Sequence, residues 1–530
     1  MQSSREKMLD LVFYQVYPRS FNDTNGDGIG DLNGVTQKLD VLADLGINAI
    51  WLSPCYKSPN RDNGYDISDY RDIMDEFGTL ADWERLISEA HKRGIRLIMD
   101  LVANHTSDQH YWFREARKSR DNPYHDYYYW AEKPLNDWKA CFGGSAWEYN
   151  EPTGEYYLHS FAIQQPDLNW ENPRVRAEMC AVVDYWVDKG VDGFRCDVLD
   201  YISKDFQQGK MFNGPRLHEY IRELFDRDKT RHIFTVGECQ SGEKDVTDIC
   251  GADRHELTCI FQFEHFGVGR GGKFDRQPYE IDEVRDILVK WQNFTAKHDL
   301  LYTLFTDNHD QAHYISRLGN DTTLRYECAT MYAAMFYLLK GIPFIYQGQE
   351  FGTPDPHYDK IEDFNDVETW NYYRENLGKM SEKELMEKIN FGSRDNVRRP
   401  IAWTGGENFG FGTGKPWITL HSRGAEVNAE KDAQSEKSVR RFYKELLQFR
   451  KQSKAIRYGS FADLTAQKGC FVYQRTYGEE QVLVVCNFDR ENTIRVPAGD
   501  YRLVLSNYGH TSRQAGGGYQ PFETAVFVRK

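Results

Sequence analysis

Charged side chains in this sequence lie where short apolar runs end. The run "GVDGFRCDV" (190–198) ends near Arg195 and Asp197, two residues apart, and side chains at that spacing on a strand share one face. Two other runs end on Glu238 and on Asp310. Three carboxylates with a guanidinium beside one of them suit glycoside hydrolysis. In that reaction one carboxylate attacks the anomeric carbon and a protonated acid releases the leaving oxygen.

The elements that must position these side chains follow a regular alternation. Between the apolar runs lie amphipathic stretches such as "LADWERLISEAHKRG" (80–94), and strands alternating with helices imply a parallel sheet. Eight such units predict a (β/α)₈ barrel, in which the active site forms at the carboxyl ends of the strands. The eight candidate strands are 11–18, 48–54, 94–102, 190–198, 232–238, 259–264, 301–310 and 342–350.

Two further segments depart from the alternation. Residues 106–173 are rich in Tyr, Trp, Asn and Gly and predict a small domain inserted after the third strand. The last part of the chain, 456–530, reads as alternating strands of an antiparallel β-domain. The barrel is therefore predicted over 1–105 and 174–455.

The charge pattern also predicts how the carboxylates ionise. Arg195 is expected to keep Asp197 ionised and ready to attack. The carboxylates around Glu238 are expected to raise its pKa by like-charge repulsion, so that it can act as an acid. A bell-shaped pH profile of kcat/KM follows.

Six segments together resemble a known family. "DLVANH", "GFRCDV", "VGE" and "FTDNHD" resemble the four signature regions of the α-amylase family of glycoside hydrolases, in the family's order. "QPDLNW" (165–170) and "SRDNVRRPIAW" (393–403) resemble motifs of its oligo-1,6-glucosidase and α-glucosidase branch. The resemblance covers nearly the whole chain.

The resemblance implies roles for the catalytic carboxylates. Asp197 would be the nucleophile, Glu238 the general acid and base, and Asp310 the carboxylate that fixes the sugar hydroxyls. The same resemblance implies a set of substrate-binding residues: Tyr65, Asp66, His105, Phe161, Gln165, Arg195, Val198, His309 and Arg394.

Within that set, Asp66 would bind the terminal glucose and Tyr65 would offer a stacking face. Arg394 would pair with Asp66 and close the floor of the pocket, with Arg398 as the rival candidate, since spacing does not separate the two. A closed floor implies action on chain ends.

Val198 follows the nucleophile, and valine there resembles the α-1,6-acting members of the branch. The sequence thus predicts a retaining enzyme that releases glucose from the non-reducing end of short α-1,6-linked gluco-oligosaccharides. An α-1,4-glucosidase, a trehalose-6-phosphate hydrolase and a sucrose isomerase stay open as alternatives. Phosphosugar recognition would need basic residues at the pocket. The basic segment "VGRGGKFDR" (268–276) is interpreted instead as a flexible glycine loop with solvated charge.

A non-enzyme alternative is a sugar-binding or transporter-associated subunit that has lost catalysis. Such subunits carry a membrane-spanning helix and have usually lost the carboxylates. This sequence shows no such helix and has all three carboxylates.

The segment "DTNGDGIGD" (23–31) predicts a metal loop. Oxygen ligands alternate along it as in the first nine positions of an EF-hand loop, and position twelve is Gly34, so the bidentate glutamate is missing. The expected ion is Ca²⁺ in a structural role, with no organic cofactor. The predicted ligands are Asp23, Asn25, Asp27, Ile29 and Asp31.

Bulk composition excludes some partners. A net charge of -15 argues against a nucleic-acid binder, since phosphate contacts need clustered Lys and Arg. No stretch predicts a membrane span or a signal peptide, and ten scattered Cys fit a reducing compartment. The expected protein is a cytoplasmic monomer acting on small oligosaccharides.

Overall fold

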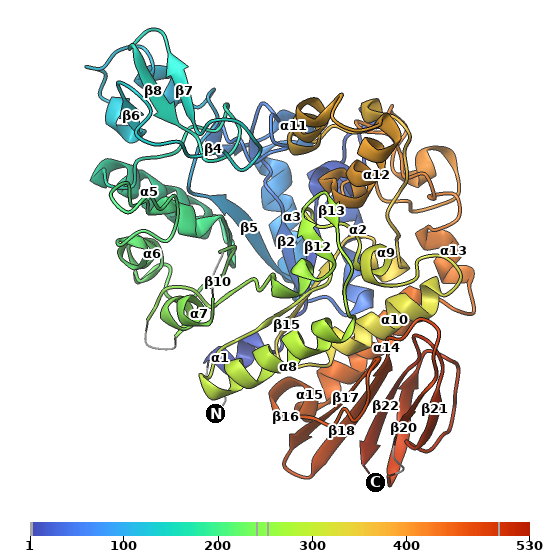
Figure 1. The fold of residues 1–530 in the computed structure, drawn as a ribbon. Coiled ribbons are helices and arrows are strands. Elements are labelled where there is room, and N and C mark those ends of the chain that lie inside the picture. Colours follow the sequence, from blue (N-terminus) through green and yellow to red (C-terminus); the bar gives the residue numbers. More distant parts are fainter. Residues whose placement is uncertain (1–3, 240–241, 252–253, 497–498, 530) are drawn as a thin grey trace.

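Eight parallel strands form the centre of the protein in a computed structural model, which describes residues 4–239, 242–251, 254–496 and 499–529 (Figure 1). The remaining positions of the predicted barrel and C-terminal domain (1–3, 240–241, 252–253, 497–498 and 530) lie outside the described residues. The strands are β1 (Phe13–Val16), β2 (Ala49–Leu52), β5 (Arg96–Val102), β9 (Gly193–Asp197), β10 (Phe234–Gly237), β11 (Cys259–Ile260), β14 (Thr303–Leu304) and β15 (Ile342–Tyr346).

The strand order β11-β10-β9-β5-β2-β1-β15-β14 brings the sheet almost round to its start. Thr303 on β14 donates from Oγ1 to the carbonyl of Ile260 on β11 at 3.2 Å, across the remaining gap. The strands are apolar on both faces because helices cover the sheet outside and side chains fill it inside. The predicted (β/α)₈ barrel is confirmed.

Helices surround the sheet, and several of them begin at a capping side chain. Asp31 accepts from the amide of Gly34 at the start of α2, and Thr79 and Asp82 form a capping box on α3. The barrel helices are α2 (Leu32–Leu45), α3 (Leu80–Lys92), α5 (Pro173–Asp188), α6 (Leu217–Phe225), α7 (Glu243–Cys250), α8 (Asp282–Lys297), α10 (Arg325–Tyr337) and α14 (Val439–Gln452). None of the described helices is long and apolar enough to cross a membrane.

The connection between β5 and α5 carries a small antiparallel sheet in the order β6-β8-β7, which lies apart from the barrel at the upper left of Figure 1. A hairpin of β3 and β4 follows β2, and α1 precedes β1. These elements are α1 (Ser4–Met8), β3 (Tyr56–Lys57), β4 (Asp69–Ile73), α4 (Tyr111–Ala116), β6 (Trp130–Ala131), β7 (Trp147–Asn150) and β8 (Glu155–Leu158).

Long connections after β11, β14 and β15 add further elements near the carboxyl ends of the strands. The segment predicted as a flexible glycine loop forms the hairpin of β12 and β13, which packs beside α12 (Figure 1). These elements are β12 (Arg270–Gly272), β13 (Asp275–Arg276), α9 (Tyr314–Leu318), α11 (Val367–Asn376), α12 (Glu382–Gly392) and α13 (Ala429–Gln434).

After α15 (Lys454–Tyr458) the chain forms the predicted antiparallel domain, a sheet in the order β16-β17-β18-β22-β20. This sheet packs on α10, where the hydroxyl of Tyr473 donates to the carbonyl of Ala334. Its strands, with the separate pair β19 and β21, are β16 (Ser460–Asp463), β17 (Cys470–Tyr477), β18 (Glu480–Asn487), β19 (Ile494–Val496), β20 (Tyr501–Ser506), β21 (Gly517–Tyr519) and β22 (Thr524–Arg529).

Candidate active site

The predicted catalytic carboxylates lie at the carboxyl ends of their strands. Asp197 is the last residue of β9, Glu238 follows β10 directly, and Asp310 lies in the loop after β14. Asp100 on β5 stands opposite Arg195 in the parallel ladder between β5 and β9. Strand register therefore brings the guanidinium between carboxylates that are far apart in sequence.

The guanidinium of Arg195 binds three carboxylates at once. Its Nη1 donates to Asp100 at 2.8 Å and to Asp197 at 2.6 Å, and its Nη2 donates to Glu238. Arg195 is only 1% exposed, so these contacts are made almost without solvent. Because Asp197 and Glu238 bind neighbouring nitrogens of one planar group, they face the same small volume.

Burial controls the ionisation of this group. It raises the pKa of Asp197 to about 7 and the pKa of Glu238 to about 7, and the charge of Arg195 offsets only part of the effect. Repulsion between the carboxylates also raises these two pKa values. The sequence suggested repulsion as the main cause, but the main cause is burial. One cation faces three acids, so Arg195 does not keep Asp197 ionised alone, and the group retains a proton near neutral pH.

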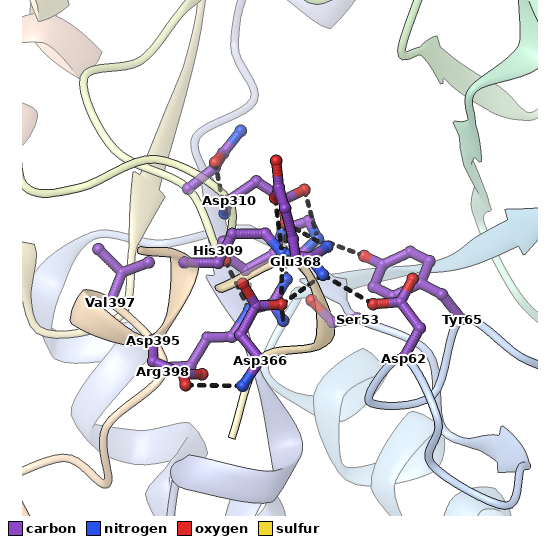
Figure 2. A network of polar contacts seen from close by, with 12 residues as sticks. Ser53, Asp62, Tyr65, His309, Asp310, Asp366, Glu368, Asp395, Val397 and Arg398 are labelled. Carbon is purple, nitrogen blue, oxygen red and sulfur yellow. Dashed lines mark hydrogen bonds and ion pairs between the residues drawn. The ribbon is translucent and has the colours of Figure 1, made fainter. Parts of the chain in front are cut away.

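Asp310 differs from these two. Burial acts to raise its pKa, but His309, Arg398 and Arg394 together hold that pKa well below the usual range. Arg398 donates from Nη2 to Asp310 at 2.6 Å, and His309 Nε2 lies 3.0 Å from the other carboxylate oxygen (Figure 2). Asp310 is therefore a fixed anion, suited to bind hydroxyls rather than to exchange protons.

Tyr65 and His309 form one wall of the site. Their rings stack at 5.3 Å between centroids, and the Tyr65 hydroxyl lies 2.6 Å from His309 Nε2 (Figure 2). The same hydroxyl donates to Asp100 at 3.1 Å. The contacts of its hydroxyl with His309 and Asp100 thus fix this tyrosine in one position.

The predicted pairing of Asp66 is wrong. Asp66 is fully buried, and its carboxylate accepts hydrogen bonds from the Ser58 hydroxyl and the amides of Arg61 and Asp62. These bonds stabilise the loop 58–66 itself. Asp62 takes the predicted role instead, because Arg394 Nη2 donates to it at 2.9 Å. Arg394, and not Arg398, forms this pair.

Arg394 and Arg398 divide the acidic groups between them. Arg394 also donates to Asp366, the N-cap residue of α11. Arg398 instead binds Asp310 (Figure 2). The guanidinium of Arg394 lies 4.6 Å from the centre of the Phe142 ring, which comes from the inserted segment. The Asp62–Arg394 pair therefore joins the loop after β2 to the connection after β15.

His105, Gln165 and Phe161 lie together as predicted from the sequence. The ring centroids of His105 and Phe161 are 5.3 Å apart, and Gln165 Nε2 lies 3.2 Å from His105 Nε2. Gln165 also donates to Asp62 at 3.1 Å. Three segments therefore meet on one side of the pocket.

A buried ion pair fixes the inserted segment to the barrel. Lys204 Nζ lies 2.9 Å from Asp167, and neither side chain is exposed. Lys204 also donates to Asn104, the neighbour of His105, and Asp167 accepts from Ser160, the neighbour of Phe161. The pair thus fixes the backbone on both sides of the substrate-binding residues.

Val198 adopts a left-handed backbone conformation, with φ of 34° and ψ of 47°. A β-branched residue is strained there, and strain of this kind persists mainly at functional sites. Val198 and Glu238 line a cavity of about 550 Å³ that extends toward β12. Val198 therefore shapes the wall beside the nucleophile.

The loop 23–31 is closed by its own hydrogen bonds. Asp23 accepts from the amides of Asn25, Gly26 and Gly28, and Asp27 accepts from the amide of Ile29. Asp31 accepts from Thr24 and caps α2. No group of three or more His, Cys, Asp or Glu side chains is arranged to hold a metal ion in the ranges that the structure describes.

Sequence reasoning missed three residues of the site. Asp62 stands in the same motif as Asp66, so the signal was present but ambiguous. Lys204 follows the apolar segment "VLDYIS", which is a weak sign of a buried lysine. Asp366 lies in a long connection where nothing in the sequence distinguishes it.

Comparisons with known proteins agree with this geometry. A family model described as the α-amylase catalytic domain matches residues 15–459, and one described as the α-amylase C-terminal all-β domain matches 463–524. An oligo-1,6-glucosidase of Parageobacillus thermoglucosidasius is 46% identical, with 94% of each chain covered. A trehalose-6-phosphate hydrolase of Bacillus subtilis is 41% identical, covering 90% of this chain and 89% of its own. The crystal structure of isomaltulose synthase from Erwinia rhapontici has a TM-score of 0.94 at 37% identity and covers 100% of both chains.

Proposed function

The chain belongs to the α-amylase family of glycoside hydrolases, and we propose that it is a retaining, exo-acting α-glucosidase that releases glucose from short α-1,6-linked gluco-oligosaccharides. The observation that carries this proposal is the arrangement around Arg195, which holds Asp197 and Glu238 on adjacent nitrogens in a buried site. A retaining glycosidase needs two carboxyl groups close together, one as nucleophile and one as acid.

In this mechanism Asp197 attacks the anomeric carbon while Glu238 gives its proton to the leaving oxygen. The bond to the leaving sugar breaks and a covalent glucosyl-enzyme forms at Asp197. Glu238, now a carboxylate, takes a proton from water, which attacks the anomeric carbon and frees Asp197. The raised pKa of Glu238 supports its role as the acid.

A pocket closed at one end would confine the enzyme to chain ends, and the contacts of Arg394 support such a closure. Arg394 binds Asp62 across two connections, and its guanidinium packs against Phe142. Asp310, held as an anion, would accept hydrogen bonds from the hydroxyls of the terminal glucose. A polymer that continued past this glucose would meet the Asp62–Arg394 pair.

The α-1,6 preference rests on Val198 and on the names of relatives. Val198, in its strained conformation beside the nucleophile, would narrow the part of the cavity that receives the leaving sugar. Relatives named oligo-1,6-glucosidase are 46% and 42% identical over nearly the full chain.

Glucose release from isomaltose and from maltose, measured side by side, tests the proposal. Wild-type protein should cleave isomaltose faster than maltose, and Asp197→Ala should cleave neither while unfolding at the same temperature as the wild type. A preference for maltose would make the protein an α-1,4-glucosidase. Preference for trehalose 6-phosphate would overturn the proposed substrate.

We also propose that the loop 23–31 binds Ca²⁺ in a structural role. Its oxygen-only donor set, Asp23, Asn25, Asp27, Asp31 and the carbonyl of Ile29, supports this ion. Incubation with a chelator should then lower the unfolding temperature, and an unchanged temperature would refute the proposal.

Ten free cysteines, most of them buried, support a cytoplasmic location, and we expect a monomer.

A further inference from the structure

Arg270, the first residue of β12, has an unusual environment. It lines the cavity of about 550 Å³ beside Glu238 and Val198, which is called the leaving-sugar cavity below. Its Nη1 donates to Gln311 at 2.5 Å, but its Nε and Nη2 are buried and have no hydrogen-bond partner among the described residues. The sequence suggested solvated charge at this segment, and for Arg270 that expectation is wrong.

Arg270 also has no direct ion-pair partner among the described residues, although the charges of Asp355 and Glu368 act on it from further away. No Asp or Glu lies within ion-pair distance of it in the described part of the chain, whereas Lys273 in the same hairpin pairs with Glu368. An arginine offers five N–H donors in a fixed fork, and a buried guanidinium without partners is costly. Arg270 thus combines spare donors with a place on the cavity wall beside the catalytic acid, which makes it a candidate to bind a ligand there.

The hairpin that carries Arg270 is held in place. Lys388 on α12 donates to Asp275 at 3.0 Å, and Lys273 is anchored by Glu368 on α11. The tether Gln311 directly follows the predicted catalytic residue Asp310. The Arg270 side chain is therefore fixed relative to the site of bond cleavage, as a residue that orients substrate must be.

Resting on the proposed function, we propose that Arg270 is a specificity residue that donates hydrogen bonds to hydroxyl oxygens of the leaving sugar. The cavity is lined by two acidic residues, Asp200 and Glu238, and by two basic ones, Arg270 and Lys273, and this balance favours a neutral polyol over an anion. The leaving sugar of an α-1,6 substrate presents several hydroxyls to this wall. Contacts made by Arg270 would hold it while Glu238 protonates the leaving oxygen.

The test compares a leaving group with hydroxyls and one without. Isomaltose and phenyl α-glucoside share the glucosyl unit, but the phenyl group offers no hydroxyl to Arg270. We expect Arg270→Met to lower kcat/KM for isomaltose by about 10- to 100-fold, the usual effect of losing hydrogen bonds to a charged group. Phenyl α-glucoside should stay within about 2-fold of the wild type, because its aglycone never used those bonds.

Arg276 provides a matched control. It is paired with Arg270 across the hairpin, and both guanidinium groups lie within 5.8 Å of the centre of the same Phe391 ring. Arg276 is exposed and does not line the leaving-sugar cavity. Arg276→Met should therefore leave kcat/KM unchanged for both isomaltose and phenyl α-glucoside. If Arg270→Met fails to fold, Arg270→Lys keeps the charge but loses the fork, and the loss should still be confined to isomaltose.

The inference is overturned if Arg270→Met lowers kcat/KM equally for both substrates, or lowers it for neither. A wild-type preference for trehalose 6-phosphate that Arg270→Met abolishes would assign Arg270 to an anionic leaving sugar and also overturn it. Failure of the wild type to cleave isomaltose would instead refute the proposed function, so the two failures are distinguishable.

Discussion

Replacing Lys204 by methionine should destabilise the protein and weaken substrate binding together. Lys204 is fully buried and contacts Asp167 at 2.9 Å, the carbonyl of Tyr201 at 2.7 Å and Asn104 at 3.0 Å. Methionine preserves most of the volume but removes the charge. Asp167 would then be a buried carboxylate with no cation beside it.

The magnitude follows from that uncompensated charge. Removing one partner of a buried ion pair costs about 3–5 kcal/mol, whereas replacing both partners is often close to neutral. Asp167 keeps the amide of Ser160 and the side chain of Asn104 as donors, which places the loss toward the lower end of that range. The double variant Lys204→Met with Asp167→Asn should recover at least half of the loss.

Thermal unfolding at one fixed scan rate, with KM for isomaltose, measures both effects. KM should rise because the pair holds the neighbours of His105 and Phe161. Lys210→Met, exposed on the same connection, is the matched control and should change neither quantity. The reasoning is refuted if Lys204→Met unfolds at the wild-type temperature, or if the double variant is less stable than the single one.

Three further predictions concern the pocket itself. Asp62→Asn removes a charged partner of Arg394 and should raise KM for isomaltose about 10-fold or more, whereas an unchanged KM would mean that the pair does not shape the pocket. The profile of kcat/KM against pH should be a bell: it falls as the pH rises through about 7, where Glu238 loses its proton, and falls again in acid as a second proton neutralises Asp197. A profile that stays flat through neutral pH would contradict this. Val198→Ala should shift the ratio of kcat/KM for isomaltose and maltose toward maltose by about 10-fold, and an unaltered ratio would remove Val198 from the specificity argument.

The barrel was predictable because both faces of its strands are buried. That burial makes the strands read as apolar runs, and the catalytic residues follow where the runs end. All eight strands lie within the predicted runs. The runs at 259–264 and 301–310 are longer than β11 and β14, since their later residues leave the sheet to form the loops that carry Phe263 and Asp310.

The pairing of Arg394 was not predictable from spacing. Asp62 and Asp66 stand four residues apart in one loop. Only the folded structure shows that the carboxylate of Asp66 already accepts three hydrogen bonds from within that loop. Lys204 and Arg270 raise the same difficulty. Both read as ordinary charged residues in connections, and their burial comes from contacts with segments far away in sequence.

The central claim is that Asp197 forms a covalent bond to glucose. Intact-mass spectrometry of the Glu238→Gln variant after reaction with 5-fluoro-α-glucosyl fluoride tests it most directly, because the missing acid and base slows hydrolysis of the glucosyl-enzyme. We predict a mass increase of one fluoroglucosyl group, mapped by peptide digestion to Asp197. A label on another residue, or no label while fluoride is released, would contradict the account.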